Sequence, residues 1–206
     1  MNLALLLFVK NPVLGTVKTR LAQTTGDEFA LAAYRVLLTH TRKVTEAVDV
    51  TRYLFYASTI TEHDEWSADR FEKRVQPNGN LGDRMRAAFE EVLAKHDAAI
   101  IIGSDCADLR PEHLERARTE LTTHDAVIGP VFDGGYYLLG LKNPLPDVFS
   151  GIEWSTETVF RETARRLVEL ERTFATLPTL HDVDYEEDWV RTGWTVEEDD
   201  LPKSPR

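Results

Sequence analysis

The chain has 206 residues, with 35 Asp and Glu against 24 Lys and Arg, and its formal net charge is −11. This acidity argues against binding to nucleic acid or to anionic membranes, because both attract basic surfaces. The single cysteine, Cys106, excludes an internal disulfide and a cysteine-built zinc site, so we expect a protein of the reducing cytoplasm.

Strand-like and helix-like stretches alternate along the chain, which is typical of βαβ construction with a mostly parallel sheet. The first apolar run, Leu3–Val9, is too short to span a bilayer and lacks the flanks of a signal peptide, so it predicts a buried strand. Further strands are predicted at residues 52–57, 73–76, 98–102, 125–131, 136–141 and 174–177. Helices are predicted at residues 27–48, 62–70, 81–96, from 111 onward, 156–171 and 185–191. We expect a single domain over residues 1–194 and a flexible tail over residues 195–206.

The loop after the first strand, residues 10–20, places Lys10, Lys18 and Arg20 together in an otherwise acidic chain. Cationic side chains and backbone N–H groups on such a loop suit a pyrophosphate. Gly15 is the only glycine of the loop, which excludes a dinucleotide fingerprint, and the Gly-Lys-Ser/Thr spacing of a Walker loop is missing. A solvated basic loop is the alternative interpretation.

A second candidate binding loop covers residues 76–85 and contains Gln76, Gly82 and Arg84. Glycine lets the backbone approach a ligand closely, and Arg84 stands in the first turn of a predicted helix. These residues therefore become candidates for nucleotide and phosphate binding. An ordinary loop and helix start would produce the same pattern.

A second apolar run, Ala98–Ile102, is followed three residues later by Asp105, and Asp108 comes three residues after that. A run without polar alternation predicts a strand buried on both faces, and ligands bind beyond the carboxyl ends of such strands. Carboxylates at that position suit Mg²⁺ or Mn²⁺ better than zinc. A cap of the following turn is the competing role for Asp105.

Residues 133–136 form a tight turn between two predicted strands, with Asp133 at its head followed by Gly134, Gly135 and Tyr136. An Asp-Gly hairpin explains the two glycines by itself. The functional alternative is an acceptor pocket walled by the glycines, lined by Tyr136 and closed by Asp133.

Near the end of the chain, Asp182 and Asp184 alternate along one short segment. In an extended backbone they would lie on the same side, where Asp184 would supply a further metal ligand. The competing role for Asp184 is a cap of the helix that follows.

Together, the segments FVKNPVLGTVKTRL, QPNGNLGDRM, IIGSDCADL, IGPVFDGGYYLLGL, IEWST and DVDYEED resemble bacterial transferases of GT-A (nucleotide-diphospho-sugar transferase) fold. Members are labelled radical-SAM/selenodomain-associated transferase 1 or arsenosugar-biosynthesis-type glycosyltransferase. The resemblance covers residues 3–192, and the basic loop is also similar to that of phospholactate and molybdenum-cofactor guanylyltransferases. It implies a Rossmann-like three-layer α/β/α fold.

The resemblance also implies roles for individual residues. Asp105 matches the strand-end aspartate that binds the metal, while Lys18 and Arg20 match the loop that holds a diphosphate or triphosphate. The second aspartate of the Asp-x-Asp motif is missing, so Asp108 or Asp184 would have to complete the coordination of the ion.

The resulting hypothesis is a metal-dependent glycosyltransferase with a nucleotide-sugar donor and a small-molecule acceptor. Lys10, Lys18 and Arg20 would hold the diphosphate, and a divalent cation on Asp105 would offset charge on the departing nucleoside diphosphate. Asp133 is the candidate base for the acceptor hydroxyl. One alternative is a guanylyltransferase-like nucleotidyltransferase, which joins an NTP to a phosphorylated small molecule and releases pyrophosphate. A non-catalytic nucleotide-binding module is the other.

Overall fold

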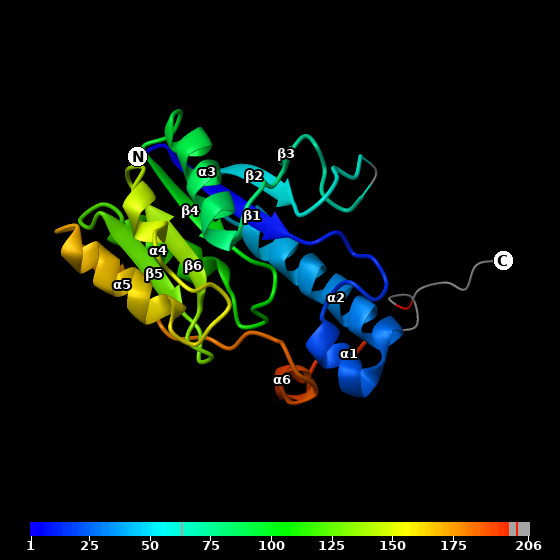
Figure 1. Ribbon diagram of the computed structural model, residues 1–206. Coiled ribbons are helices and arrows are strands. Elements are labelled where there is room, and N and C mark those ends of the chain that lie inside the picture. Colours follow the sequence, from blue (N-terminus) through cyan, green and yellow to red (C-terminus); the bar gives the residue numbers. More distant parts are fainter. Residues whose placement is uncertain (63, 198–200, 202–206) are drawn as a thin grey trace.

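The computed structural model describes residues 1–62, 64–197 and 201, and its centre is a single β-sheet (Figure 1). Seven strands in the described part of the chain are arranged in the order β3-β2-β1-β4-β6-β5-β7. Their bounds are β1 (Leu3–Val9), β2 (Thr51–Tyr56), β3 (Glu72–Val75), β4 (Ala98–Ile102), β5 (Ala126–Pro130), β6 (Tyr136–Leu141) and β7 (Phe174–Thr176). All seven coincide with predicted strands to within a residue or two.

Neighbouring strands are parallel except at β6, which runs antiparallel to both β4 and β5. The turn between β5 and β6 is the predicted Asp-Gly hairpin, in which Gly134 has a φ of 92° that favours glycine. Because β6 is reversed, its amino end lies at the same sheet edge as the carboxyl ends of β1 and β4. The start of β6 and the ends of the parallel strands can therefore line one site.

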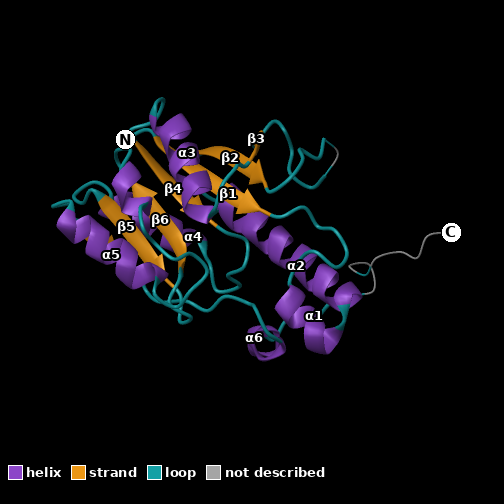
Figure 2. Cartoon of the chain, in the orientation of Figure 1, coloured by secondary structure: helices purple, strands orange, loops and turns teal. Residues whose placement is uncertain are grey.

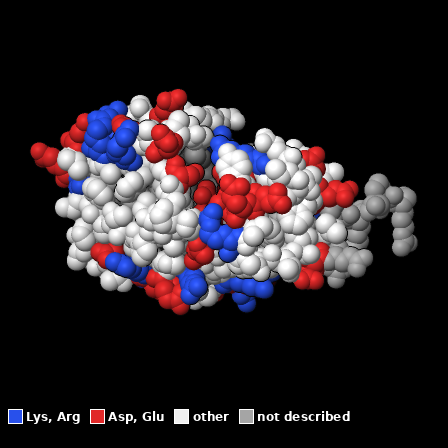
Figure 3. Space-filling view, turned by 90° about the horizontal axis from the view of Figure 1, so that it is seen from below, with Lys and Arg blue, Asp and Glu red and all other residues white. Residues whose placement is uncertain are grey.

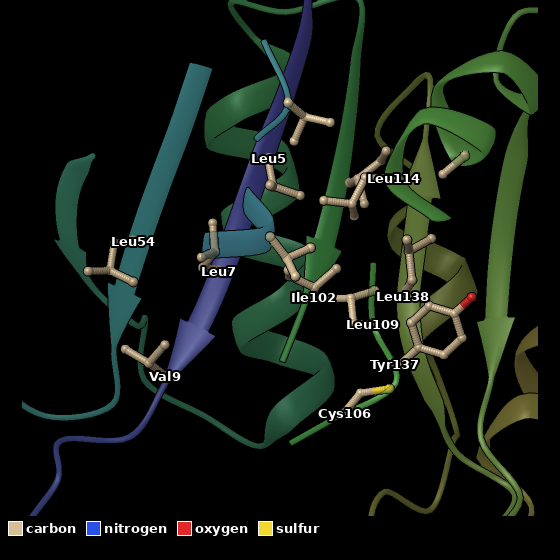
Figure 4. Packing of buried hydrophobic residues seen from close by; sticks show 14 of the residues in the cluster. Leu5, Leu7, Val9, Leu54, Ile102, Cys106, Leu109, Leu114, Tyr137 and Leu138 are labelled. Carbon is tan, nitrogen blue, oxygen red and sulfur yellow. The ribbon is translucent and has the colours of Figure 1, made fainter. Parts of the chain in front are cut away.

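Helices cover both faces of the sheet, which confirms the predicted three-layer α/β/α arrangement (Figure 2). Alternate residues of β1 point into opposite layers, as the pleat requires. Leu5 and Leu7 pack with Ile102 and with Leu114 of a helix on one face (Figure 4), while Leu6 packs on the other face. The helices are α1 (Thr19–Thr25), α2 (Asp27–Glu46), α3 (Leu81–Leu93), α4 (Pro111–Glu120), α5 (Val159–Glu169) and α6 (Glu186–Thr192), with a 3₁₀ turn, η1, at Pro146–Phe149. Of these, α2 and α4 lie against one face, and α3 and α5 against the other.

A smaller cluster joins the beginning of the chain to its end. Residues of α2 pack with Leu21 of α1, with Trp189 of α6 and with Val183, which precedes α6. The rings of Trp189 and Phe29 meet edge-on, with their centroids 5.9 Å apart. Helix α1 is absent from the sequence prediction, because seven residues after a basic loop show too little helical periodicity. This cluster holds the basic loop and the acidic segment around residue 183 beside each other.

The predicted helix at residues 62–70 is wrong, since the described residues of this segment form bends and turns. The carboxylate of Asp64 accepts hydrogen bonds from the Trp66 amide, the Tyr56 hydroxyl and the Lys73 ammonium. Such side-chain bonds compete with a helical backbone. Aromatic packing of Trp66 on Phe71 then closes the loop against the core.

The predicted tail lies mostly outside the described residues, which include only 195–197 and 201 of that segment. Within it, Val196 packs half-buried against the cluster of α1, α2 and α6. Among the described helices, none is both long enough and apolar enough to cross a membrane.

Candidate functional site

A cavity of about 930 Å³ opens at the sheet edge where β1, β2, β3 and β4 end and β6 begins. In α/β sheets this edge is where ligands bind. Seen from below, acidic and basic side chains gather next to each other around a hollow near the middle of the molecule (Figure 3). The cavity is lined by most of the predicted site residues, namely Lys10, Lys18, Arg20, Gln76, Arg84, Asp105, Asp133, Gly135, Tyr136 and Asp184.

The segment at residues 180–184 runs across the ends of the neighbouring strands. Leu180 forms a parallel bridge with Val131, and the amide of Val183 donates to the carbonyl of Asp105 at 2.9 Å. A parallel register of 131 with 180 places residue 182 beside Asp133. The loops after β4 and β5 and this late segment are thereby joined at one point.

Three carboxylates meet there. Oxygen atoms of Asp133, Asp182 and Asp184 lie within 4.8 Å of one another, a spacing that a divalent cation can bridge. The predicted alternation of Asp182 and Asp184 on one side is confirmed, because both line the cavity while Val183 between them is buried. Only hard oxygen donors are present in this group, which suits Mg²⁺ or Mn²⁺.

The electrostatics of this group show how strongly negative it is. The pKa of Asp182 is raised to about 6, first by burial and then by the charges of Asp133, Asp184 and Asp105. Like charges that share a site disfavour ionisation in this way. A bound cation would remove that repulsion, so the charge state of the group fits an ion.

The capping alternative for Asp184 is wrong. The amides of Asp184 and Tyr185 instead donate to the carboxylate of Asp188, at 3.1 and 2.8 Å. The carboxylate of Asp184 is turned toward the basic loop, where the Arg20 guanidinium binds it at 2.7 Å. Arg20 also lies over the ring of Tyr185, 5.7 Å from its centroid.

Lys18 is buried at the centre of these charges. Its ammonium forms an ion pair with Asp105, donates to the carbonyl of Val183 at 2.6 Å and lies 3.9 Å from Asp184. The Lys18 side chain is only 4% exposed and its backbone has a φ of 49°, which places it in the left-handed region. In this structure Lys18 therefore joins the acidic loops to one another, and its predicted contact with phosphate stays a prediction.

Asp105 and Asp108 separate from each other in space. Asp105 lines the cavity beside Lys18, and its carboxylate is half exposed and free to take a further partner. Asp108 does not line the cavity; it lies near His40 and His113, where burial lowers the pKa of each histidine and the charge of Asp108 opposes that shift. The structure thus brings Asp184 together with Asp133 and Asp182, in place of the predicted set of Asp105, Asp108 and Asp184.

At the other end of the cavity, Gln76 and Arg84 form a linked pair. The amide nitrogen of Gln76 donates to the carbonyls of Val9 and Phe55, and its oxygen accepts from Arg84 at 3.1 Å. Arg84 also donates to the carbonyl of Gly79 at 3.0 Å, which leaves other guanidinium donors available. Gln76, which directly follows β3 and bonds to β2, therefore orients Arg84.

Lys10 lies at the end of β1 in the same part of the cavity. Its backbone N–H donates to the Tyr34 hydroxyl at 2.8 Å, and that hydroxyl lies 3.2 Å from the hydroxyl of Ser104. Burial raises the pKa of Tyr34 well above its usual value, so this phenol stays neutral. The Lys10 ammonium has no ion-pair partner within the described residues, so Lys10 and Arg84 are cations that an anionic ligand can reach.

Three glycines of the predicted site do not line the cavity, and each has a backbone or packing role. Gly15 has a φ of 74° in the basic loop. A Cβ on Gly134 would collide with the carbonyl of Glu157, and a Cβ on Gly82 would collide with the indole of Trp154. Gly82 therefore acts through Trp154, which does line the cavity.

Trp154 and Glu157 line the cavity without having been predicted as site residues, and for Asp182 the sequence predicts only a place on the same side as Asp184, without a role of its own. Trp154 occurs in the IEWST segment that contributes to the family resemblance, but its spacing alone carries no chemical signal. Glu157 lies at the start of the predicted helix at 156–171, which in fact begins at Val159.

Comparison with known proteins identifies the family and the fold. A family described as "Uncharacterized protein conserved in bacteria (DUF2064)" matches residues 18–156, from Lys18 through the β5–β6 hairpin to Thr156. A search of curated proteins finds no match. A crystal structure of a putative nucleotide-diphospho-sugar transferase from Desulfovibrio desulfuricans G20 is 30% identical, with a TM-score of 0.81 over 89% of this chain and 83% of that one.

More distant solved structures share the fold. CMP:2-keto-3-deoxy-manno-octonic acid synthetase complexed with CTP is 11% identical, with a TM-score of 0.59, 93% coverage of this chain and 96% of that one. Rv0371c from Mycobacterium tuberculosis H37Rv, solved in complex with manganese, is 12% identical, with a TM-score of 0.58, 93% coverage of this chain and 98% of that one. The predicted fold class and the prediction of a transferase are confirmed by these similarities. The chain belongs to the DUF2064 family.

Proposed function

We propose that the protein is a metal-dependent glycosyltransferase that uses a nucleotide-sugar donor and a small-molecule acceptor. The observation that carries the proposal is the division of one cavity into a cationic end with Lys10 and Arg84 and an acidic group of Asp133, Asp182 and Asp184. The 30% identical relative described as a nucleotide-diphospho-sugar transferase supports the same class of reaction. The narrower label of radical-SAM/selenodomain-associated transferase 1 and a cytoplasmic location stay predictions from the sequence.

The cationic end suits the phosphates of the donor. Lys10 presents its ammonium directly after the end of β1, and Arg84 presents donors from the first turn of α3; neither side chain is held by a carboxylate of the described residues. Arg20 is tied to Asp184 on the opposite side, where it can meet the distal phosphate. Guanidinium and ammonium groups hold diphosphates through charge-assisted hydrogen bonds.

The acidic group suits a divalent cation. Asp133, Asp182 and Asp184 would hold Mg²⁺ or Mn²⁺, with Asp105 beside them as a further oxygen donor. When bound, such an ion stabilises the negative charge that develops on the departing nucleoside diphosphate. Supporting this, a structure of the same fold has been solved with manganese.

The role of Asp133 as the acceptor's base is separable from a role as a ligand. Its carboxylate accepts from the amide of Gly135 at 2.9 Å and faces Asp182. We expect Asp133→Asn to reduce turnover at least 100-fold in either case. Loss of metal affinity in the same variant identifies Asp133 as a ligand, whereas unchanged metal affinity identifies it as the base.

The test is an assay of products. The protein is incubated with Mg²⁺ or Mn²⁺, with separate panels of sugar nucleotides and NTPs, and with mixtures of sugar and phosphorylated acceptors. Release of nucleoside diphosphate from a sugar nucleotide supports the proposal. Release of pyrophosphate from an NTP overturns it in favour of nucleotidyl transfer, and nucleotide binding without either product favours a non-catalytic module. Asp184→Asn should be inactive, while Asp108→Asn, a carboxylate outside the cavity, serves as the matched control.

A further inference from the structure

The cationic side chains of the cavity are unevenly distributed. Lys10 follows β1, and Arg84 is bonded to Gln76 and Gly79 at the β3 side. Lys18 and Arg20 are bound to Asp105 and Asp184. In the sheet order, β4 separates this region from β6.

The remaining part of the cavity, here called the β6 half, is lined by Tyr136, Trp154, Thr156 and Glu157 together with Met85 and Val159. Among its described lining residues there is no Lys or Arg, and its one charged side chain is that of Glu157. A phosphorylated acceptor would bring about two negative charges against this carboxylate and the neighbouring acidic group. The β6 half is therefore unsuited to a phosphate group.

Trp154 forms a fixed aromatic surface in this half. One edge of the indole packs against Gly82 of α3 so closely that an added Cβ would collide with it. The ring of Phe149 lies behind it, with centroids 6.4 Å apart. Trp154 is half-buried and lines the cavity, so part of the indole is available to a ligand.

The backbone around Glu157, which lines the cavity, packs against the β5–β6 turn. The close approach of Gly134 holds the Glu157 carbonyl, and the amide of Phe160 donates to the carbonyl of Gly134 at 2.8 Å. The Glu157 carboxylate is exposed, and no hydrogen bond or ion pair within the described part of the chain engages it. It is thus available to accept hydrogen bonds from a ligand, and an ionised carboxylate accepts from hydroxyl groups with particular strength.

We propose that the β6 half binds the uncharged, hydroxyl-rich ring of a sugar. The C–H face of such a ring packs on the indole of Trp154, and its hydroxyls donate to Glu157. This assignment rests on the proposed glycosyl transfer and gives its substrate class: the ring bound here carries no phosphate of its own. The same chemistry fits the sugar of the donor or a sugar acceptor, and binding measurements distinguish the two.

The test compares nucleotide sugars with bare diphosphates by calorimetry in the presence of Mn²⁺. UDP-glucose, UDP-galactose and GDP-mannose are titrated beside UDP and GDP, and methyl glucoside, methyl galactoside and methyl mannoside are titrated onto the protein loaded with each diphosphate. A sugar that enhances nucleotide affinity at least 3-fold is that of the donor. A methyl glycoside that binds only to the loaded protein identifies the acceptor.

The variants are Trp154→Ala and Glu157→Gln, with Glu153→Gln as the matched control, since Glu153 is a nearby exposed carboxylate outside the cavity. We expect the ratio of the affinity for the sugar ligand in the wild type to that in either variant to be about 10, while the affinity for the bare diphosphate changes less than 2-fold. Gly82→Ala, which displaces the indole without removing it, should act in the same direction if Trp154→Ala proves unstable.

Two results overturn the assignment. One is a gain in nucleotide affinity from the sugar that is the same in the variants and in the wild type. The other is stronger displacement of the bound sugar by glucose 6-phosphate than by glucose. Failure of the proposed function is distinguishable from both. It is seen as an absence of Mn²⁺-dependent diphosphate binding, and saturation-transfer NMR with the three methyl glycosides on the unloaded protein then decides the assignment of the sugar ring separately.

Discussion

Replacement of Lys18 by Met tests whether this residue holds together the loop that carries Asp105 and the segment around Val183. The substitution keeps the length and apolar stem of the side chain and removes the ammonium that binds Asp105 and the Val183 carbonyl. Removing one partner of a buried ion pair costs about 3–5 kcal/mol, because the other charge is left without compensation. Here the partners are partly solvated, with side chains 51% exposed for Asp105 and 31% for Asp184, so water recovers part of that loss.

We therefore expect Lys18→Met to lower the free energy of unfolding by about 2 kcal/mol. For a chain of this size the melting temperature should fall by roughly 4–8 °C. Urea unfolding followed by circular dichroism measures the first quantity and a thermal scan the second. Lys10→Met is the matched control, because its ammonium lines the same cavity without an ion pair to the described residues, and we expect a change below about 0.5 kcal/mol.

A double-mutant cycle assigns the effect to the contact itself. If Lys18 acts through Asp105, then Lys18→Met and Asp105→Asn should be non-additive, with a coupling energy of about 1–2 kcal/mol. Additive effects, or a loss of less than about 0.5 kcal/mol in Lys18→Met, would refute the assignment of Lys18 as the link between these loops.

Three further predictions concern the acidic group and Trp154. Burial and like charges raise the pKa of Asp182 from 3.8 to about 6, so the wild type loses stability as the pH rises from about 4 to 6. Asp182→Asn should therefore stabilise the metal-free protein by about 1–2 kcal/mol at pH 8 and have little effect at pH 4. Equal effects at both pH values in urea titrations would contradict this. Saturating Mn²⁺ should raise the melting temperature of the wild type by roughly 5–10 °C, and that of the control Asp108→Asn by the same amount. Asp184→Asn should lose this shift. If Asp184→Asn keeps the shift, Asp184 is not a ligand of the ion. Gly82→Ala should destabilise the protein by about 1–3 kcal/mol, because the added Cβ would collide with the indole of Trp154. This loss should outweigh the higher helix propensity of alanine. A variant that is stabilised in thermal scans would show that the indole is free to move.

Several parts of the molecule follow from local sequence alone. The strand Ala98–Ile102 is predicted from five consecutive apolar residues, and all five are buried. The β5–β6 hairpin is predicted from Asp133 and its two glycines, since a positive φ at Gly134 is a local requirement. These features depend on periodicity and turn chemistry, which neighbouring residues determine among themselves.

Errors occurred where distant residues compete with local preference. Residues 62–70 have the composition of a short helix, but Asp64 bonds to Tyr56 and Lys73, and these contacts impose turns instead. In helix α1 distant contacts act in the opposite direction and favour a helix. Packing of Leu21 with Val183 and Trp189 stabilises a segment that is too short to be helical by propensity.

The sequence by itself determined the order of the seven strands along the chain and the loops that supply charged side chains. Tertiary structure alone decided which of those charges meet. Asp133 and Asp182 are 49 positions apart in the chain, and they converge because Leu180 pairs in parallel with Val131 just after β5. Lys18 faces Asp105 for a similar reason, since Val183 bonds to the carbonyl of Asp105 in the loop after β4 while packing with α1. Such meetings depend on strand order and register, which are global properties of the sheet that no local pattern of residues encodes.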